Sequence, residues 1–241
     1  MQQMSPMRSA IAMVELVFAI VIMGIVLLSA PRLISVSTKS SYVAVQQEAI
    51  NEAATQLNII LGYPWDEENT DENYLPPVLR VSAGNVDLDE QNGTGIGRRV
   101  GTPAQSSRSF YRVDGKDFNA SAIGSDGNDS DDMDDFDGEN HLVQIEATPN
   151  DYIERDTIKI TTQIQYGNDD TQSGSGTYKT PLNHSITYSP DFSNAATPTS
   201  NIKFITVTLE STSAATELHK QITLHAFSAN IGGYEPLERT Y

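Results

Sequence analysis

The stretch Ile11-Ala-Met-Val-Glu15-Leu-Val-Phe-Ala-Ile-Val-Ile-Met-Gly24-Ile-Val-Leu-Leu-Ser-Ala30 decides how this chain is organised. It is apolar throughout except for one acid, Glu15. A helix of about 20 residues spans roughly 30 Å, the thickness of the hydrocarbon core of a bilayer. An ionised carboxylate in that core costs at least ~2.5–3.5 kcal/mol. We therefore predict a membrane helix whose acid finds a partner once the helix leaves lipid.

The composition of the whole chain excludes several function classes. Its 241 residues include 32 acidic and 15 basic ones, which give a formal net charge of −17. So acidic a protein repels nucleic acid phosphates, and no nucleic acid partner is expected. There is no cysteine, so disulfides and thiolate metal sites are excluded. No Walker loop, dinucleotide glycine motif or Ser/His/Asp arrangement is present, and we do not expect an enzyme.

Two plainer interpretations of the apolar stretch are a secretory signal peptide and a simple membrane anchor. Leu28-Ser29-Ala30 loosely resembles a signal cleavage site, but the apolar run is long for a signal core and Pro31 follows the supposed cut. For the anchor, positive charges do not fix the orientation, because Arg8 precedes the run whereas Arg32 and Lys39 follow it.

The segment Ser9-Ala10-Ile11-Ala12-Met13-Val14-Glu15-Leu16-Val17 resembles the class III leader of type IV pilins and type II secretion pseudopilins. In that family a short basic leader ends in a small residue, and glutamate is the fifth residue after the cut. Here the cut would fall between Ala10 and Ile11, which makes Glu15 the fifth residue. The family usually has glycine and phenylalanine around the cut, so Ala10 and Ile11 depart from its pattern.

The resemblance implies that a prepilin peptidase cuts on the cytoplasmic side and methylates the new amino group of Ile11. The chain would enter the bacterial inner membrane as a single-pass protein with a periplasmic head. It would then join a type IV pilus-like or type II secretion filament as a minor subunit. The implied partners are other subunits, the peptidase, the inner-membrane assembly platform and, before assembly, membrane lipid. A tip adhesin, another ligand-binding subunit and a simple membrane-anchored periplasmic domain remain alternatives.

Glu15 has two candidate partners for its charge. A neighbouring subunit could place the amino group of its Ile11 against this carboxylate, and in low dielectric each charge would offset the other's desolvation. Residues 11 and 15 are also i,i+4 neighbours on one helix, so a pair within the subunit is the alternative. We predict the pair between subunits, since it would couple charge relief to assembly.

We predict an α+β fold in which a long helix covers one face of an antiparallel sheet. The helix should bend or break at Pro31 and end near Gly62 and Pro64. The expected divisions are a leader at 1–10, a transmembrane and filament-core helix at 11–30, an amphipathic helix at 31–62, a loop-rich acidic insertion at 63–140 and a sheet region at 141–241. The stripe predicted to pack on the head is Val36, Val43, Ile50, Ala54, Leu57 and Leu61.

Alternation of apolar and polar residues predicts the strands of the sheet. The four expected strands cover 141–147, 157–166, 202–209 and 221–227, and the last two should form an antiparallel hairpin. Short edge strands are expected at 74–81 and 110–113.

An acidic run at 126–139 is the second notable feature, since neither lysine nor arginine occurs between Lys116 and Arg155. One interpretation is a solvated, flexible loop, and another is a structural Ca²⁺ site, because calcium takes six to eight oxygen ligands. A local cap or a contact with a basic neighbour is the third. The spacing does not fit an EF-hand. Phe136 should point inward, and the candidate calcium ligands are Asp131, Asp132, Asp134, Asp135 and Asp137.

Overall fold

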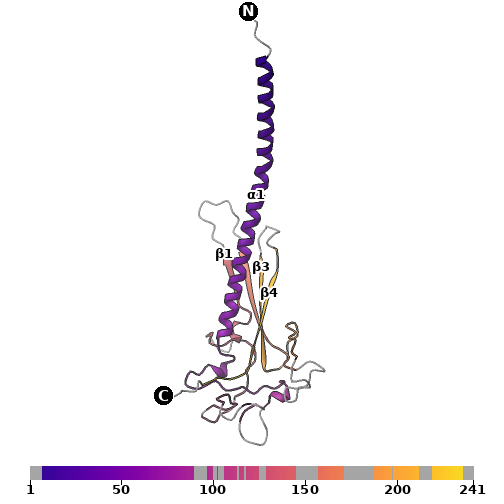
Figure 1. Cartoon of the computed structure of the whole chain (residues 1–241). Helices are drawn as coiled ribbons and strands as arrows, with labels where there is room; N and C mark the ends of the chain where they lie inside the picture. Colours follow the sequence, from indigo (N-terminus) through magenta and orange to yellow (C-terminus); the bar gives the residue numbers. More distant parts are fainter. Residues whose placement is uncertain are drawn as a thin grey trace, which may run out of the picture.

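The structure is a computed structural model that combines one long helix with a four-stranded antiparallel sheet (Figure 1). The elements are α1 (Met7–Gly62), η1 (Glu67–Asn69), η2 (Val86–Leu88), η3 (Asp134–Phe136), β1 (Asn140–Gln144), β2 (Thr157–Tyr166), β3 (Ile202–Ser211) and β4 (Ile222–Ala229). The described residues are 7–89, 97–99, 102, 106–112, 114–116, 118–124, 129–144, 157–170, 187–196, 198–211 and 219–235. The α+β layout is confirmed at this level.

Helix α1 runs without interruption through Pro31, so the predicted break does not occur. Proline removes one backbone hydrogen bond, but the other bonds of a long helix can hold the two sides together. Figure 1 shows a gentle change of direction between the upper and the lower part of the helix. The helix ends at Gly62, as predicted, and Tyr63 N donates to Ile60 O at 3.1 Å.

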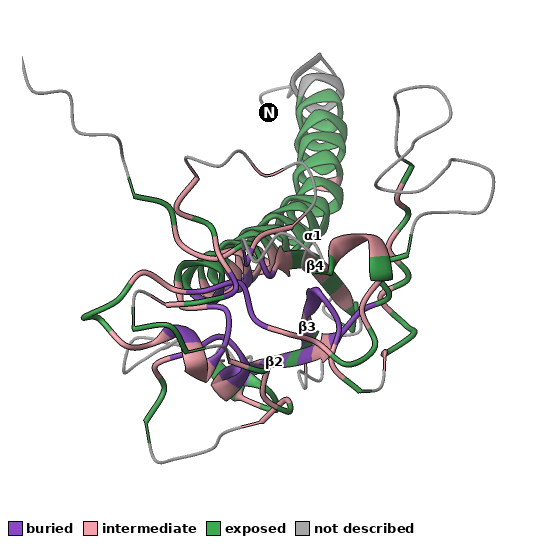
Figure 2. Ribbon diagram, turned by 90° about the horizontal axis from the view of Figure 1, so that it is seen from below, coloured by how far each residue is buried: buried purple, intermediate pink, exposed green. Residues whose placement is uncertain are grey.

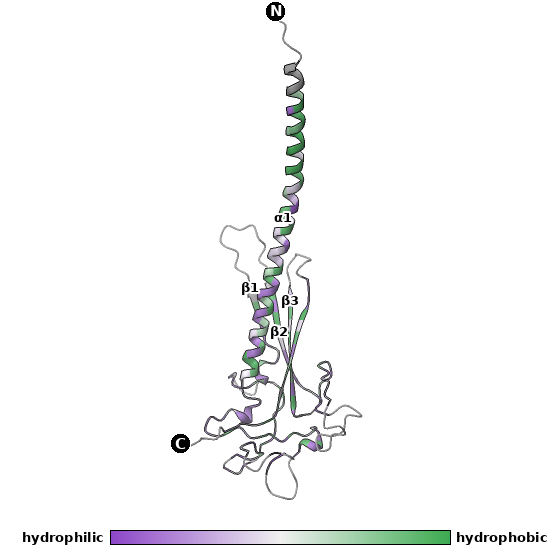
Figure 3. Ribbon diagram, in the orientation of Figure 1, coloured by the Kyte–Doolittle hydropathy of each residue, from purple (hydrophilic) through white to green (hydrophobic). Residues whose placement is uncertain are grey.

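No described residue of the head covers the first part of α1. Residues 12–41 are exposed except for the half-buried Gly24. Figure 3 shows that the upper part of this helix is mostly hydrophobic with one hydrophilic spot, whereas the lower part mixes hydrophobic and polar residues. A helix that is apolar on every side is typical of a membrane span or of the inside of a bundle.

The lower part of α1 packs on strands β3 and β4. Ala49, Ala53 and Ile60 are buried there, and Val45 and Leu57 are partly buried. Steps of four, four, four and three residues place these five side chains on one helical face. We call this face the helix seam.

The predicted stripe was wrong in its first half. Val36 and Val43 are 66% and 64% exposed, because protein cover begins only around Val45. Leu57 from the predicted stripe does pack against the core, whereas Leu61 is exposed.

The sheet has the strand order β1-β2-β3-β4, with every neighbouring pair antiparallel. The four predicted strands are confirmed within the described residues, and so is the β3–β4 pairing. Positions 145–147 of the first predicted strand lie outside those residues. The core between helix and sheet consists of the helix seam, inward-facing strand residues and two residues of the acidic run. Buried residues are purple in Figure 2. The buried members of this core outside α1 are Met133, Phe136, Ile158, Ile160, Ile164, Ile205, Val207 and Leu209.

Within the described residues, neither of the short edge strands expected at 74–81 and 110–113 forms, and position 113 lies outside those residues. The first segment makes an isolated parallel bridge between Arg80 and Asn119, and Val78 N donates to Ser109 O at 2.6 Å. Pro76 and Pro77 lack an N–H group, so this stretch cannot supply the regular donors of a ladder.

Candidate functional site

Glu15 lies on the exposed apolar part of α1, four residues beyond Ile11. Its neighbours Met13, Leu16 and Phe18 are all more than half exposed. Among the described residues, one helix, Ala12–Gly62, is long and apolar enough to cross a membrane by length and composition. Ala10 and Ile11 lie within α1, which begins at Met7, and their side chains are not described. While that peptide bond is intact the nitrogen of Ile11 is a neutral amide, so it offers Glu15 no charge.

A buried lysine in the head is the feature that sequence reasoning missed. The side chain of Lys203 on β3 is 0% exposed. Its Nζ donates to Asp134 Oδ1 at 2.7 Å, to Trp65 O at 2.7 Å and to Asp66 Oδ2 at 3.2 Å. The rings of Trp65 and Tyr166 lie 4.5 and 5.4 Å from the same nitrogen. An ammonium group in such a place needs these partners, because burying an unpaired charge is prohibitive.

Asp66 connects this lysine to the loops at the end of the helix. Its carboxylate accepts hydrogen bonds from Ser121 N at 3.1 Å, Ser121 Oγ at 3.2 Å and Tyr166 OH at 3.4 Å. It also caps η1 by accepting from Glu68 N at 3.4 Å. Both oxygens of Asp66 are therefore occupied.

Asp132 and Asp134 are buried beside Lys203 at the start of η3. Asp132 Oδ1 accepts from Asp134 N at 2.9 Å and from Asp135 N at 3.2 Å, as a cap does. Burial, with a further contribution from Asp134, raises the pKa of Asp132 to about 8. Burial also raises the pKa of Asp134, although Lys203 opposes that shift. Asp66 and Asp134 thus pair with one lysine, and the buried Asp132 lies next to them, where burial and the neighbouring carboxyl favour its protonated form.

Two of the three remaining candidate calcium ligands, Asp135 and Asp137, bind backbone amides, whereas Asp131 Oδ1 is buried and has no hydrogen-bond partner among the described residues. Asp135 Oδ2 accepts from Asp131 N at 3.1 Å, and Asp137 Oδ1 accepts from Ile164 N at 2.7 Å. Phe136 points inward as predicted, with its ring 4.8 Å from that of Tyr63.

These contacts agree with the interpretation of the acidic run as a local cap with a basic neighbour. Within the described ranges, no three His, Cys, Asp or Glu side chains are arranged to hold a metal ion. Positions 126–128 of the run lie outside the described residues. Calcium binding by this loop stays a prediction.

The sequence contains a pattern that indicates the burial of Lys203. The side chains of a strand alternate between two faces, and Lys203 has the same parity as Ile205, Val207 and Leu209. Those three residues form the core face of β3. A lysine in register with such residues must be buried or lie at the end of the strand. Its partners come from segments 69 and 137 positions away, so local sequence does not identify them.

We expect the head to lose stability as pH rises from about 4 to 8. The folded state raises the pKa of Asp132 from 3.8 to about 8, so it binds more protons than the unfolded chain in this window. One proton changes the unfolding free energy by at most ~1.4 kcal/mol per pH unit. Circular dichroism melts of the full chain in detergent between pH 5 and 8 measure the slope. Asp132→Asn should flatten it, whereas Asp129→Asn, at an exposed position of the same loop, should not; equal slopes in all three proteins would contradict the assignment.

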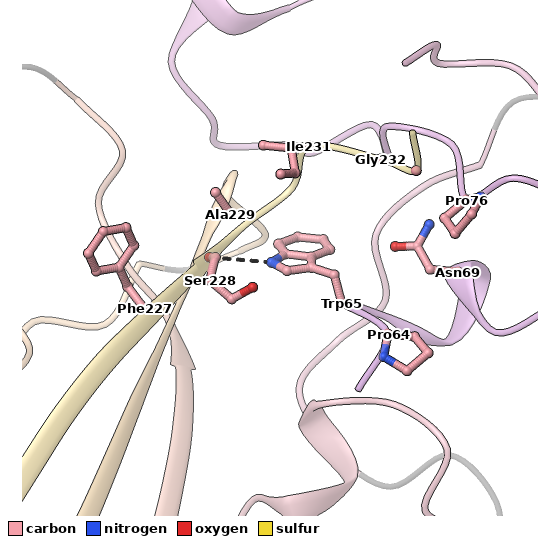
Figure 4. Close-up of a pocket in the computed structure, with 10 residues that line it drawn as sticks. Pro64, Trp65, Asn69, Pro76, Phe227, Ser228, Ala229, Ile231 and Gly232 are labelled. Carbon is pink, nitrogen blue, oxygen red and sulfur yellow. Dashed lines mark hydrogen bonds between the residues drawn. The ribbon is translucent and has the colours of Figure 1, made fainter. Parts of the chain in front are cut away.

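A shallow pocket of about 380 Å³ lies beside this cluster (Figure 4). The indole of Trp65 forms one wall, and its Nε1 donates to Ser228 O at 3.4 Å. Gly232 has a φ of 66° and lies against the backbone of Pro76, where a Cβ would be within 3.1 Å of the Pro76 carbonyl oxygen. The pocket offers apolar surface and backbone groups, with Asn69 and Ser228 as its polar side chains.

Comparison with protein-family models, curated proteins and solved structures gave no match.

Proposed function

We propose that this chain is a minor subunit of a type IV pilus-like or type II secretion filament. The observation that carries the proposal is the position of Glu15, fifth after the Ala10–Ile11 bond, on an apolar helix. The corresponding function class is a structural subunit, which needs no catalytic centre.

The exposed apolar rod supports assembly through the helix. Lipid can cover such a rod in the membrane, and several neighbouring helices can cover it inside a filament. Among the described residues, the head packs on the lower part of α1, from about Val45 to Ile60. The upper part therefore keeps its whole surface for these neighbours.

Glu15 would make the transfer from lipid to filament selective. In lipid its carboxylate has a high free energy, and the ammonium group of Ile11 created by cleavage is a matching charge. A staggered neighbouring subunit that brings the carboxylate and the ammonium group together offsets the desolvation penalty of both charges. The proposal places the protein in the inner membrane with a periplasmic head before assembly, with the prepilin peptidase and the assembly platform as partners.

The mature N-terminus tests this proposal most directly. Mass spectrometry of the protein purified from its native membranes should find a chain that begins at Ile11 and carries one methyl group on its amino nitrogen. Ala10→Leu should block the cut, because the peptidase requires a small residue there, while Ser9→Leu serves as a neighbouring control. A chain that still begins at Met1, or one that begins at Pro31, would overturn the proposal.

A further inference from the structure

Lys203 and Asp134 are placed as a reactive pair as well as an ion pair. The amine nitrogen lies 2.7 Å from Asp134 Oδ1, and the two side chains are 0% and 2% exposed. Holding two reacting groups in contact replaces a bimolecular encounter and lowers the entropic part of the reaction barrier. Water, the product of a condensation between them, is scarce in such a site.

Burial favours the neutral form of the Asp134 carboxyl, which is the form that a condensation needs. The rings of Trp65 and Tyr166 flank the nitrogen of Lys203 and favour its ammonium form, so the reaction needs a base that takes a proton from it. Burial raises the pKa of Asp134 and of the adjacent Asp132, in the direction that the condensation requires.

Asp134 is the better acyl partner of the two aspartates that contact Lys203. Both oxygens of Asp66 accept hydrogen bonds from Ser121, and one of them also accepts from Tyr166. Asp134 Oδ2, in contrast, is buried and has no hydrogen-bond partner among the described residues. No hydrogen bond among the described residues therefore holds the second oxygen of Asp134, whereas Asp66 is fixed as a base 3.2 Å from Nζ.

We propose that Lys203 and Asp134 join in an intramolecular amide bond, with Asp66 as the proton acceptor. Asp66 takes one proton from the ammonium group of Lys203 and keeps it. The amine nitrogen then bonds to Cγ of the protonated Asp134 carboxyl, the C–O bond breaks, and a second nitrogen proton leaves with the hydroxyl as water. The ammonium, the Asp66 carboxylate and the Asp134 acid become one amide, one protonated Asp66 and one water, and nothing is oxidised or reduced.

Such a bond would link η3 to β3 across 69 positions of the chain. It would fix the acidic loop to the central part of the sheet in a way that neither pH nor salt could release. The inference concerns the head alone and does not depend on the proposed function.

The mass of the denatured full chain decides the proposal. We expect the wild type to weigh one water less than its sequence, whatever its N-terminus, and a digest to contain a branched peptide that joins the segments around Asp134 and Lys203. Lys203→Arg and Asp134→Ala should both keep the full mass of their sequences. Asp134→Asn should lose ammonia instead of water and reach the same mass as the wild type.

Asp66→Asn tests the proton acceptor, and its chain should retain the water that the wild type loses. A wild-type chain with the full sequence mass overturns the proposal, and this result does not depend on whether any variant folds. The proposal is also overturned if the Lys203→Arg chain still weighs one water less than its sequence. It is overturned as well if the digest locates the lost water at a cyclised aspartate and not in a branched peptide.

Discussion

Glu15→Gln and Glu15→Ala chains are expected to enter the membrane normally and to lose at least about 100-fold in filament incorporation. Removing one partner of a buried ion pair leaves the other charge unpaired, a penalty of about 3–5 kcal/mol, and each 1.4 kcal/mol is a factor of ten. Insertion should not suffer, because either substitution removes a charge from an otherwise apolar helix.

Immunoblots of sheared filaments measure filament incorporation, and immunoblots of membrane fractions from the same cells measure membrane insertion. Glu48→Gln is the matched control, since Glu48 is an exposed acid on the same helix but beyond the apolar stretch. Wild-type incorporation of both Glu15 variants would contradict the role assigned to this acid, and poor insertion would show that it acts earlier.

Lys203→Met should destabilise the head by about 3–5 kcal/mol. The substitution keeps most of the side-chain volume but leaves Asp66 and Asp134 without their cation in a closed site. The loss is expected whether the link to Asp134 is ionic or covalent. Urea unfolding of the full chain in detergent, followed by circular dichroism and by the fluorescence of Trp65, the single tryptophan, measures it.

Two further variants separate charge from packing in this experiment. Lys159→Met removes a half-buried lysine on the neighbouring strand β2 and should change stability by less than about 1 kcal/mol. Lys203→Met combined with Asp134→Leu should recover part of the loss, because it removes one of the unpaired carboxylates. A Lys203→Met head as stable as the Lys159→Met head would contradict the argument.

Periodic patterns made the long elements predictable from the sequence. The run from Ile11 to Ala30 and the ending at Gly62 indicated the helix, and period-two alternation located the four strands to within a few residues. The helix seam was harder, because its position depends on where the head begins to cover the helix. Val36 and Val43 continue an apolar pattern into a part of α1 that the head does not reach.

The acidic loop shows why local composition is a poor guide to a site. A run of aspartates suggested solvent or a metal ion, yet Asp132, Asp135 and Asp137 accept hydrogen bonds from backbone amides, and Asp134 pairs with Lys203. Those amide donors belong to turns that exist only after folding, and the cation comes from β3. Neither could be inferred from the run itself.

The helix seam is synthesised before the strands that cover it. Its cover is supplied by β3 and β4, which the ribosome makes more than a hundred positions after Ala49, Ala53 and Ile60. At synthesis rates of about 5–20 residues per second, the seam waits on the order of ten seconds for these strands. During that interval an apolar helical face is open to the wrong partners. A chaperone that shields it until translation ends would raise the yield of folded heads.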